Sequence, residues 1–430
     1  MPKVLIITYY WPPAGGPGVQ RILGFVRYLP MFGWEPVVVT VLKGDYSNED
    51  PSLLQQVPEK VKVYKIPARE PFNLYRRLTG KKRDEKIPTH ILAAEKNQSF
   101  RERLSRFIRL NFFIPDARIG WIPYLTKTGT QIVQKEIPDI LISSSPPHSL
   151  QLATKKIARK TDIKWIADFR DPWTDFFHYQ EKGRLCFARY LDRYFEKSIL
   201  KSVDAAVTVS PSLSALFKKK VPTLKATVIT NGFDPEEYND LLIKKHPHFT
   251  LFYAGSMRKS QCPMTFFDAL QALIKKGKTP FNIRIAGSIH PHIKQAIEER
   301  DLTESFTFLG YLEHRKVLQE MINAHLLLLL IPNTEQNEGI LTGKLFEYMA
   351  SGTPILGFGP EQGDAAAILK ETKTGIMIDY DKDPTSLLEI AYDAVKVEQK
   401  QGKHHIPDAV LKYSRYETTR KLAELLEDIL

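Results

Sequence analysis

Short apolar runs alternate with amphipathic helical stretches along the chain, and this alternation restricts the fold more than any other sequence feature. The first run, Val4–Thr8, leads into a turn rich in Gly and Pro at Pro12–Gly18. A helical spacing of apolar residues follows between Ile22 and Leu29, and the next strand-length run is Pro36–Thr40. Apolar strands that alternate with helices are typical of a parallel sheet covered on both faces, so the sequence predicts an α/β protein.

The alternation of strand-length apolar runs and helical stretches occurs in two separate series along the chain. A polar and charged segment at 231–249 separates the first series from a second one, which begins at Thr250–Gly255. A chain of 430 residues is also too long for one ordinary hydrophobic core. We therefore expect two doubly wound, Rossmann-like domains, residues 1–240 and 241–410, that face a cleft where strand ends converge and ligands bind. The last amphipathic stretch predicts a helix within 411–430.

The positive charge of the chain is concentrated in its first half. The formal net charge is +12; residues 1–240 contain 38 Lys and Arg against 25 Asp and Glu, and residues 51–120 alone contain 16 against 7. Such a surface suits nucleic acid, an anionic lipid or an acidic glycan, although an ordinary solvated surface can have the same composition. Within it, Arg101–Phe113 has the pattern of an interfacial helix or of a helix that covers a core. The membrane alternative predicts contact with anionic lipid through residues 76–113.

The cysteines and the apolar segments indicate a cytoplasmic protein. Cys186 and Cys262 are far apart and match no ligand spacing, so neither a disulfide framework nor a Cys-rich metal site is expected. The N-terminus lacks the features of a signal peptide, and the most apolar run, His325–Pro332, is too short to span a bilayer. We expect no metal and no cofactor, and at most peripheral attachment to the inner face of the membrane.

The second half contains candidate anion-binding residues. Arg258 and Lys259 directly follow the strand that ends near Gly255, where cations suit a diphosphate, although a basic loop can have the same sequence. Further along, a Gly-bearing loop opens a helix with Thr342 and Lys344 at its start. The helix N-terminus can hold a phosphate with Lys344 beside it.

Glu347 lies one turn further along this helix and is a candidate for binding a vicinal diol such as ribose. A carboxylate can accept hydrogen bonds from two neighbouring hydroxyls. The alternative is a solvated helical Glu, but the apolar neighbours Leu345, Phe346 and Met349 indicate a partly buried position.

The first half contributes a second group of candidates. Gly15 and Gly16 lie in the turn between the first strand and the following helix. They form either an anion-binding turn or a tight turn without a ligand. Asp168, Arg170 and Asp171 end a later strand, where carboxylates serve as a base or orient hydroxyls; Asp–Arg pairs are equally frequent as structural locks. His148, in a strand-end loop, and Arg21 are candidates for contact with an acceptor.

These segments together resemble the retaining glycosyltransferases of family 4, which have the GT-B fold. The blocks that carry the resemblance, in order, are Pro12–Gly18, Ile114–Trp121, Ser145–Pro147, Ala167–Trp173, Val209–Ser212, Thr230–Asp234 and Lys344–Pro354.

The resemblance implies an acceptor-binding N-terminal domain, a C-terminal domain that binds a nucleotide-sugar, and a final helix that returns to the N-terminal domain. It assigns Arg258 and Lys259 to the donor diphosphate, Glu347 to the ribose, and Gly16 to a loop that faces the diphosphate. The first acid of the family's Glu-x7-Glu motif falls on Gly339, which leaves the donor sugar open. A second departure is Arg170–Asp171, where many members have His-Asp.

The resulting expectation is a metal-independent retaining hexosyltransferase. It would transfer a sugar from a nucleoside-diphosphate sugar to a glycan or lipid-linked acceptor in the synthesis of surface polysaccharide or glycolipid. The alternative enzyme is a nucleotide-sugar epimerase of the same fold. A nucleic-acid-binding protein is the weaker alternative, because the basic region lacks the interleaved aromatics of a stacking platform.

Overall fold

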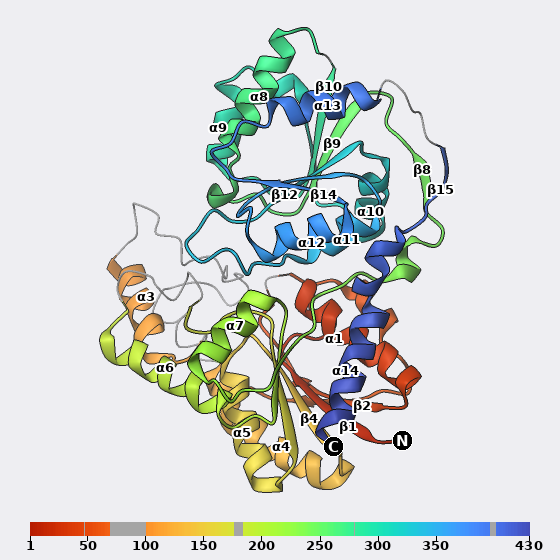
Figure 1. Ribbon diagram of the computed structural model, residues 1–430. Helices are drawn as coiled ribbons and strands as arrows, with labels where there is room; N and C mark the ends of the chain where they lie inside the picture. The colour runs from red at the N-terminus through yellow and green to blue at the C-terminus, as the bar shows by residue number, and fades with distance from the viewer. Residues whose placement is uncertain (47, 69–99, 176–183, 279, 396–400) are drawn as a thin grey trace. The chain divides into compact units, whose positions relative to one another are not determined.

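The computed structural model describes the chain except for residues 47, 69–99, 176–183, 279 and 396–400. The chain divides into two compact units. Unit 1 consists of residues 1–230 together with 418–430, and unit 2 consists of residues 231–417. Each unit has its own parallel sheet, with helices on both faces (Figure 1).

Unit 1 is built on a seven-stranded parallel sheet with the order β3-β2-β1-β4-β5-β6-β7. Its strands are β1 Lys3–Thr8, β2 Glu35–Val41, β3 Lys62–Ile66, β4 Ile140–Ser145, β5 Lys164–Phe169, β6 Ala205–Thr208 and β7 Ala226–Val228. Its helices are α1 Pro17–Tyr28, α3 Phe100–Phe112, α4 Ile122–Glu136, α5 Ser149–Thr161, α6 Cys186–Leu200, α7 Pro211–Lys220 and most of α14, Arg415–Ile429.

Alternate residues of the central strands supply the two cores of unit 1. In β1, Val4 and Ile6 join the cluster on the side of α1, and Leu5 and Ile7 join the cluster on the side of α4 and α5. This is the two-residue period of a strand buried on both faces. The edge strand β3 was not expected from the sequence, because its exposed lysines interrupt the apolar pattern.

Unit 2 repeats the arrangement with a six-stranded parallel sheet in the order β11-β10-β9-β12-β13-β14. Its strands are β9 Phe249–Ala254, β10 Phe281–Ala286, β11 Phe306–Gly310, β12 Leu326–Leu330, β13 Ile355–Phe358 and β14 Gly375–Ile378, with the antiparallel pair β8 Leu242–Lys244 and β15 Gln401–Lys403. Its helices are α8 Met264–Lys275, α9 Pro291–Glu298, α10 His314–Asn323, α11 Gly343–Ala350, α12 Asp364–Thr372 and α13 Thr385–Val395.

Both sheets reverse their strand order once, between β1 and β4 in unit 1 and between β9 and β12 in unit 2. The predicted fold class is therefore confirmed: these are two doubly wound, Rossmann-like sheets. In such sheets ligands bind beyond the carboxyl ends of the strands at the reversal. The candidate ligand-binding loops are therefore those after β9 and before α11 in unit 2, and those after β1, β4 and β5 in unit 1.

The C-terminal helix α14 begins in unit 2 and continues into unit 1. Leu422, Ala423 and Leu426 are buried in the cluster that contains Val4 and Ile6 of β1. This packing fixes the last turns of the chain to the α1 face of the first sheet.

Across the described ranges, no helix combines the length and the hydropathy that crossing a membrane requires.

Candidate functional site

Lys344, in the first turn of α11, lies against the end of β9 in unit 2. Its ammonium donates a hydrogen bond to Tyr253 Oη at 3.0 Å and lies 4.3 Å from the centroid of that ring. Gly255 follows β9 with φ 109°, and a Cβ at this position would lie 2.6 Å from Lys344 Nζ. The glycine therefore provides both the backbone turn and the space that the lysine side chain occupies.

The surroundings of Lys344 disfavour its charge. Burial lowers the pKa of the ammonium to about 8; the carboxylate of Glu347 opposes this change, and the charge of Arg258 adds to it. Arg258 itself is exposed, one residue before the 3-10 helix Lys259–Gln261. A poorly solvated ammonium with a second cation nearby is stabilised when an anion binds beside it.

The loop that carries Arg258 is held in place from both sides. The backbone N–H of Arg258 donates to Gln261 Oε1 at 3.2 Å, and Gln261 Nε2 donates to the carbonyl of Leu330 at 2.9 Å. Gln261 therefore connects the loop after β9 to the end of β12, across the strand reversal. Lys259, the other predicted cation, is exposed at the start of the 3-10 helix.

Thr342 precedes α11 in the extended conformation of an N-cap, but its side chain makes no capping hydrogen bond. Its Oγ1 is buried, and it has no hydrogen-bond partner among the residues that the structure describes. The first backbone N–H groups of a helix also lack intrahelical partners. A buried hydroxyl, a helix N-terminus and Lys344 thus lie together, as an anion-binding site at the start of a helix requires.

Glu347 lies one turn after Lys344 and takes part in a charged network of unit 2. Its Oε1 is 4.0 Å from His314 Nε2, and the same nitrogen is 3.3 Å from Glu237 Oε2. Arg415 Nη1 lies 3.9 Å from both Glu237 Oε2 and Asp234 Oδ2. Two segments, residues 234–237 and the start of α10, therefore converge with the start of α14 on one side of α11.

The network changes the protonation of its members. Burial lowers the pKa of His314, but the hydrogen bond with Glu237 and the charges of Glu347 and Glu237 raise it to about 9. Burial raises the pKa of Glu347, and His314 is the main opposing charge. His314 is consequently a cation at neutral pH, and it favours the ionised form of Glu347.

In unit 1, Arg170 connects three of the strand-end loops. Its Nη1 donates to the carbonyl of Gly18 at 3.1 Å, its Nη2 donates to that of Pro146 at 2.7 Å, and the guanidinium lies 5.8 Å from the centroid of Tyr10. A Cβ on Gly18 would lie 2.5 Å from Arg170 Nη1, so the glycine is needed for this approach. Arg170 thus holds the Gly-rich turn against the loops after β4 and β5.

The Gly-rich turn connects β1 to α1 and has the backbone geometry expected at the start of a helix. Gly16 has φ 107° and is the N-cap of α1, and Gly15 donates its N–H to the carbonyl of Asn48 at 3.0 Å. Only glycine adopts the Gly16 conformation without strain. The turn therefore presents a helix N-terminus without a side chain in front of it.

Asp168 forms a buried ion pair, and its partner is Arg21 rather than the adjacent Arg170. Arg21 Nη2 and Nε donate to its two oxygens at 2.8 and 3.2 Å, and Ser144 Oγ donates at 2.7 Å. Arg21 Nη1 also donates to the carbonyl of Thr230 at 2.7 Å. Both side chains are 2% exposed. The pair connects α1 to β4 and β5, which is the geometry of the structural lock.

His148 and Asp171 lie near this pair in different environments. The imidazole of His148 stacks on Trp173 with centroids 4.8 Å apart, and burial together with the charge of Arg170 lowers its pKa to about 3. His148 is therefore neutral at ordinary pH, and its Nδ1 has no hydrogen-bond partner within the described chain. Asp171 is partly exposed, and burial raises its pKa against the opposing charge of Arg170.

The structure thus brings the predicted residues together in two groups. Arg258, Thr342, Lys344 and Glu347 gather around the end of β9 and the start of α11 in unit 2. Gly15, Gly16, Arg21, His148, Asp168, Arg170 and Asp171 gather at the strand ends of unit 1. Residues 76–99 of the predicted membrane segment lie outside the described residues, and α3 is the part of it that can be assessed.

Sequence reasoning missed His314, Glu237 and Tyr253. His314 begins α10, Glu237 belongs to the 3-10 helix Pro235–Tyr238, and Tyr253 is inside β9. None belongs to a motif, and their proximity to Glu347 or Lys344 is produced only by the tertiary fold. A single sequence contains no signal that would have identified them.

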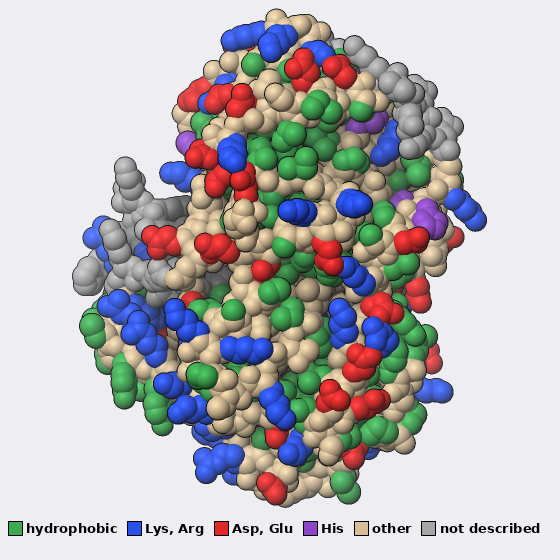
Figure 2. Space-filling view, in the orientation of Figure 1, with side chains coloured by type: hydrophobic (Ala, Val, Ile, Leu, Met, Phe, Trp, Pro, Cys, Tyr) green, Lys and Arg blue, Asp and Glu red, His purple; other side chains and the backbone are tan. Residues whose placement is uncertain are grey.

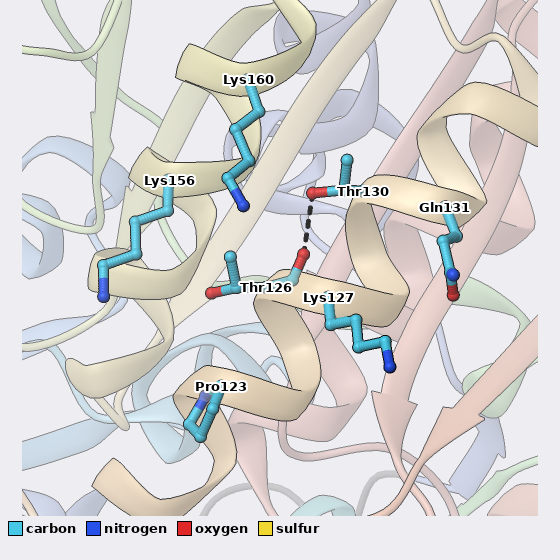
Figure 3. Close-up of a pocket in the computed structure, with 7 residues that line it drawn as sticks. All are labelled: Pro123, Thr126, Lys127, Thr130, Gln131, Lys156 and Lys160. Carbon is cyan, nitrogen blue, oxygen red and sulfur yellow. Dashed lines mark hydrogen bonds between the residues drawn. The ribbon is translucent and has the colours of Figure 1, made fainter.

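A groove of about 490 Å³ lies between α4 and α5 of unit 1, apart from both groups (Figure 3). It is lined by Lys127, Lys156 and Lys160 with Pro123, Thr126, Thr130 and Gln131. None of the predicted site residues lines it. Its three exposed lysines contribute to the basic character of unit 1.

Comparison with known proteins identifies both halves of the chain. Residues 18–237 match the family model described as Glycosyltransferase Family 4, and residues 248–395 match the model described as Glycosyl transferases group 1. No curated protein matches the chain.

Three solved structures illustrate the shared fold. The HepE protein of Anabaena in complex with UDP has a TM-score of 0.63 at 12% identity, over 99% of this chain and 100% of its own. The same protein is also known in complex with UDP-glucose. A glycosyltransferase of Rickettsia africae has a TM-score of 0.61 at 14% identity, over 99% and 98%. The lipopolysaccharide outer core galactosyltransferase WaaB has a TM-score of 0.58 at 13% identity, over 100% of both chains.

Proposed function

This chain belongs to glycosyltransferase family 4, and from that premise we propose that it transfers a hexose from a nucleoside-diphosphate sugar with retention of the anomeric configuration. Unit 2 binds the donor and unit 1 binds the acceptor. The acceptor is a glycan or a lipid-linked glycan, and the product enters surface polysaccharide or glycolipid. The fold neighbour HepE binds UDP and UDP-glucose, so UDP is the first donor nucleotide to test.

The observation that carries the proposal is the arrangement around α11. Lys344, Arg258 and the uncapped Thr342 end of the helix offer donors for a diphosphate, and Glu347 lies one turn away to accept hydrogen bonds from the ribose hydroxyls. A cation of depressed pKa beside a second cation favours a doubly charged ligand. The distance along one helical turn suits neighbouring parts of one nucleotide.

The chemistry assigned to unit 2 is stabilisation of the leaving group. As the bond between the sugar and the diphosphate breaks, negative charge develops on the phosphate oxygens. Lys344, Arg258 and Lys259 stabilise that charge in place of a metal ion, so we propose metal-independent transfer. Removing one such preorganised contact typically costs about 10²–10³ in rate. Chelation with EDTA should leave turnover unchanged.

The strand-end loops of unit 1 supply the acceptor side. Asp171 is the described carboxylate best suited to orient or deprotonate the acceptor hydroxyl, since it is partly exposed and its pKa is raised. Arg170 positions the strand-end loops of unit 1. The family resemblance assigns the turn at Gly15 and Gly16 to binding of the donor diphosphate. The buried pair Arg21–Asp168 maintains this arrangement, and His148 packs beneath the acceptor loop as a neutral ring.

The basic surface of unit 1 suggests where the acceptor is presented. We propose that the protein works in the cytoplasm at the inner face of an anionic membrane, with α3 as part of the contact. Gly339 occupies the position at which the family's first acid meets the transferred sugar, so the identity of that sugar requires a screen.

The test is to incubate the protein with UDP-hexoses, with and without a lipid-linked glycan fraction. UDP release that requires the acceptor, together with an α-linked product from an α-linked donor by NMR, supports the proposal. Conversion of the donor to another sugar in the absence of any acceptor would identify an epimerase. An inverted linkage would refute retention.

A further inference from the structure

We propose that the outer faces of α3 and α6 together form one surface that docks the protein on an anionic lipid bilayer. This proposal rests on the proposed function and deepens it, because a lipid-linked acceptor lies in a membrane and the enzyme must reach it there. It adds α6, which no sequence motif indicated, and it names the side chains that enter the bilayer interface.

The exposed face of α6 is unusually aromatic. Phe187, Tyr190 and Tyr194 are 45%, 68% and 58% exposed, and Leu185, directly before the helix, is 40% exposed. Positions 187, 190 and 194 are spaced by three and four residues, so their side chains lie on one stripe of the helix. Single exposed apolar residues are common on soluble proteins, but a contiguous stripe of large ones marks an interaction surface.

Helix α3 extends this stripe. Leu104, Phe107 and Phe112 are 48%, 40% and 62% exposed. The ring of Phe112 lies 6.5 Å from that of Phe107 and 6.1 Å from that of Phe187, so aromatic contacts run from one helix to the other. Asn111 Oδ1 also accepts the backbone N–H of Leu185 at 2.7 Å, which fixes the start of α6 to the end of α3. The two helices therefore present one continuous apolar face.

The charges of α6 are sorted between its two sides. Its two acids are buried: Asp192 pairs with Arg184 and accepts from Trp173 Nε1 at 3.3 Å, and Glu196 accepts from Lys220 at 2.6 Å. Its three cations, Arg189, Arg193 and Lys197, are all exposed. The outer face of α6 thus combines aromatic side chains with positive charge and carries no acid.

This combination is visible on the surface. Figure 2 shows hydrophobic side chains projecting at the edge where Figure 1 places α6, with Lys and Arg side chains beside them. The residues that form the apolar part are Leu104, Phe107, Phe112, Leu185, Phe187, Tyr190 and Tyr194.

An anionic bilayer fits this surface better than other partners. Phe and Leu enter the acyl boundary, Tyr keeps its hydroxyl at the headgroups, and Arg and Lys pair with anionic phosphates. A second copy of the chain would bring two positively charged faces together. Single-stranded RNA would use the same rings and cations, so RNA binding is one of the outcomes that the experiment below tests.

The experiment measures co-flotation of the full chain with vesicles of phosphatidylcholine, with or without phosphatidylglycerol. One variant combines F187S, Y190S and Y194S, and a second combines R189E, R193E and K197E; all six positions are exposed, so the fold should persist. The matched charge control combines K127E, K156E and K160E in the groove of Figure 3, which removes the same charge from the same unit. Y311S removes one aromatic ring, 84% exposed, from unit 2.

We expect flotation only with phosphatidylglycerol, and a loss of about tenfold or more in vesicle affinity for each α6 variant, because each removed cation contributes a few-fold near an anionic surface. Both controls should float like the wild type. Wild-type flotation of both α6 variants, or equal losses in the groove control, would overturn the proposal. So would a dimer in sedimentation that the F187S, Y190S and Y194S variant abolishes, or preferential binding of an RNA oligonucleotide.

Calorimetric titration with UDP, without vesicles, separates this proposal from the enzyme assignment. The α6 variants should bind UDP like the wild type. If wild-type protein binds vesicles but neither UDP nor any other nucleoside diphosphate, the docking surface stands and the proposed function fails.

Discussion

His314 Nε2 lies 4.0 Å from Glu347 Oε1, and this short separation couples the candidate ribose-binding acid to a titratable cation. Burial raises the pKa of Glu347, which by itself would weaken a carboxylate needed as a hydrogen-bond acceptor. The imidazolium of His314 opposes that change, and Glu237, 3.3 Å away, keeps the imidazole protonated. We therefore expect His314 to act as a positioning residue for the proposed donor site.

The first prediction concerns the pH dependence of this pair. The pKa of His314 in the folded protein, about 9, lies above its ordinary value of 6.5, so its stabilising effect is complete below pH 6.5 and disappears as the pH rises through 9. Thermal denaturation of wild type and His314→Asn should show a stability difference that narrows across this range. The exposed His405→Asn is the control and should show no such trend. A difference that stays constant with pH would contradict the charged pair.

The second prediction uses the depressed pKa of Lys344. Only the protonated amine attracts a diphosphate, and its pKa in the unliganded protein is about 8. The affinity for a UDP-sugar should be level below pH 8 and begin to fall above it, approaching about tenfold per pH unit. Lys344→Arg keeps its charge across pH 7–10 and should remove this fall above pH 8. Calorimetry over pH 7–10 measures this, and an affinity independent of pH in the wild type would exclude Lys344 as the diphosphate cation.

The third prediction separates two effects of a side chain at Gly255, the strain of a positive φ and the steric contact of the new Cβ with Lys344. Gly255→Ala and Gly277→Ala both place an alanine at positive φ, 109° and 80°, which costs about 1–2 kcal/mol each. Only at Gly255 does the new methyl meet Lys344; Gly277 has nothing within 4 Å of its Cβ. Both variants should lose similar stability, but only Gly255→Ala should bind UDP more weakly. Equal UDP affinities in the two variants would show that Lys344 need not occupy this space.

The fourth prediction distinguishes a structural from a catalytic Asp168. Asp168→Ala leaves Arg21 buried without its partner and should destabilise the protein by about 3–5 kcal/mol. Replacing both residues with apolar ones should cost less than the sum of the single changes. Glu361→Ala, which breaks an exposed pair with Lys382, should cost less than about 1 kcal/mol. Urea denaturation gives these values. A stable Asp168→Asn variant with greatly reduced turnover would instead make Asp168 catalytic.

The residue pattern was sufficient for the architecture because parallel strands buried on both faces leave unbroken apolar runs, as in Val4–Ile7 and Leu326–Leu330. The edge strand β3, which is partly exposed to solvent, has no unbroken apolar run in the sequence. In Lys62–Ile66 only Ile66 is buried, so the place of this strand at the sheet edge depends on pairing with β2.

The candidate site was predictable only where its residues are contiguous with strand ends or a helix start. Thr342, Lys344 and Glu347 belong to one segment, and their spacing along α11 is visible in the sequence. The pairing of Asp168 with Arg21, 147 positions away, and the approach of His314 to Glu347 depend on long-range packing. Arg170, two residues after Asp168, instead connects the strand-end loops.

The central claim is that unit 2 binds a nucleotide diphosphate at the start of α11, and paired calorimetric titrations with UDP and uridine test it most directly. Lys344→Met should reduce the affinity for UDP by about 10–100-fold, because the substitution removes one charge-assisted contact. The affinity for uridine, which has no phosphate, should stay unchanged. Glu347→Ala should weaken both ligands, since both contain the ribose. Unchanged UDP affinity in Lys344→Met and Glu347→Ala would contradict the claim.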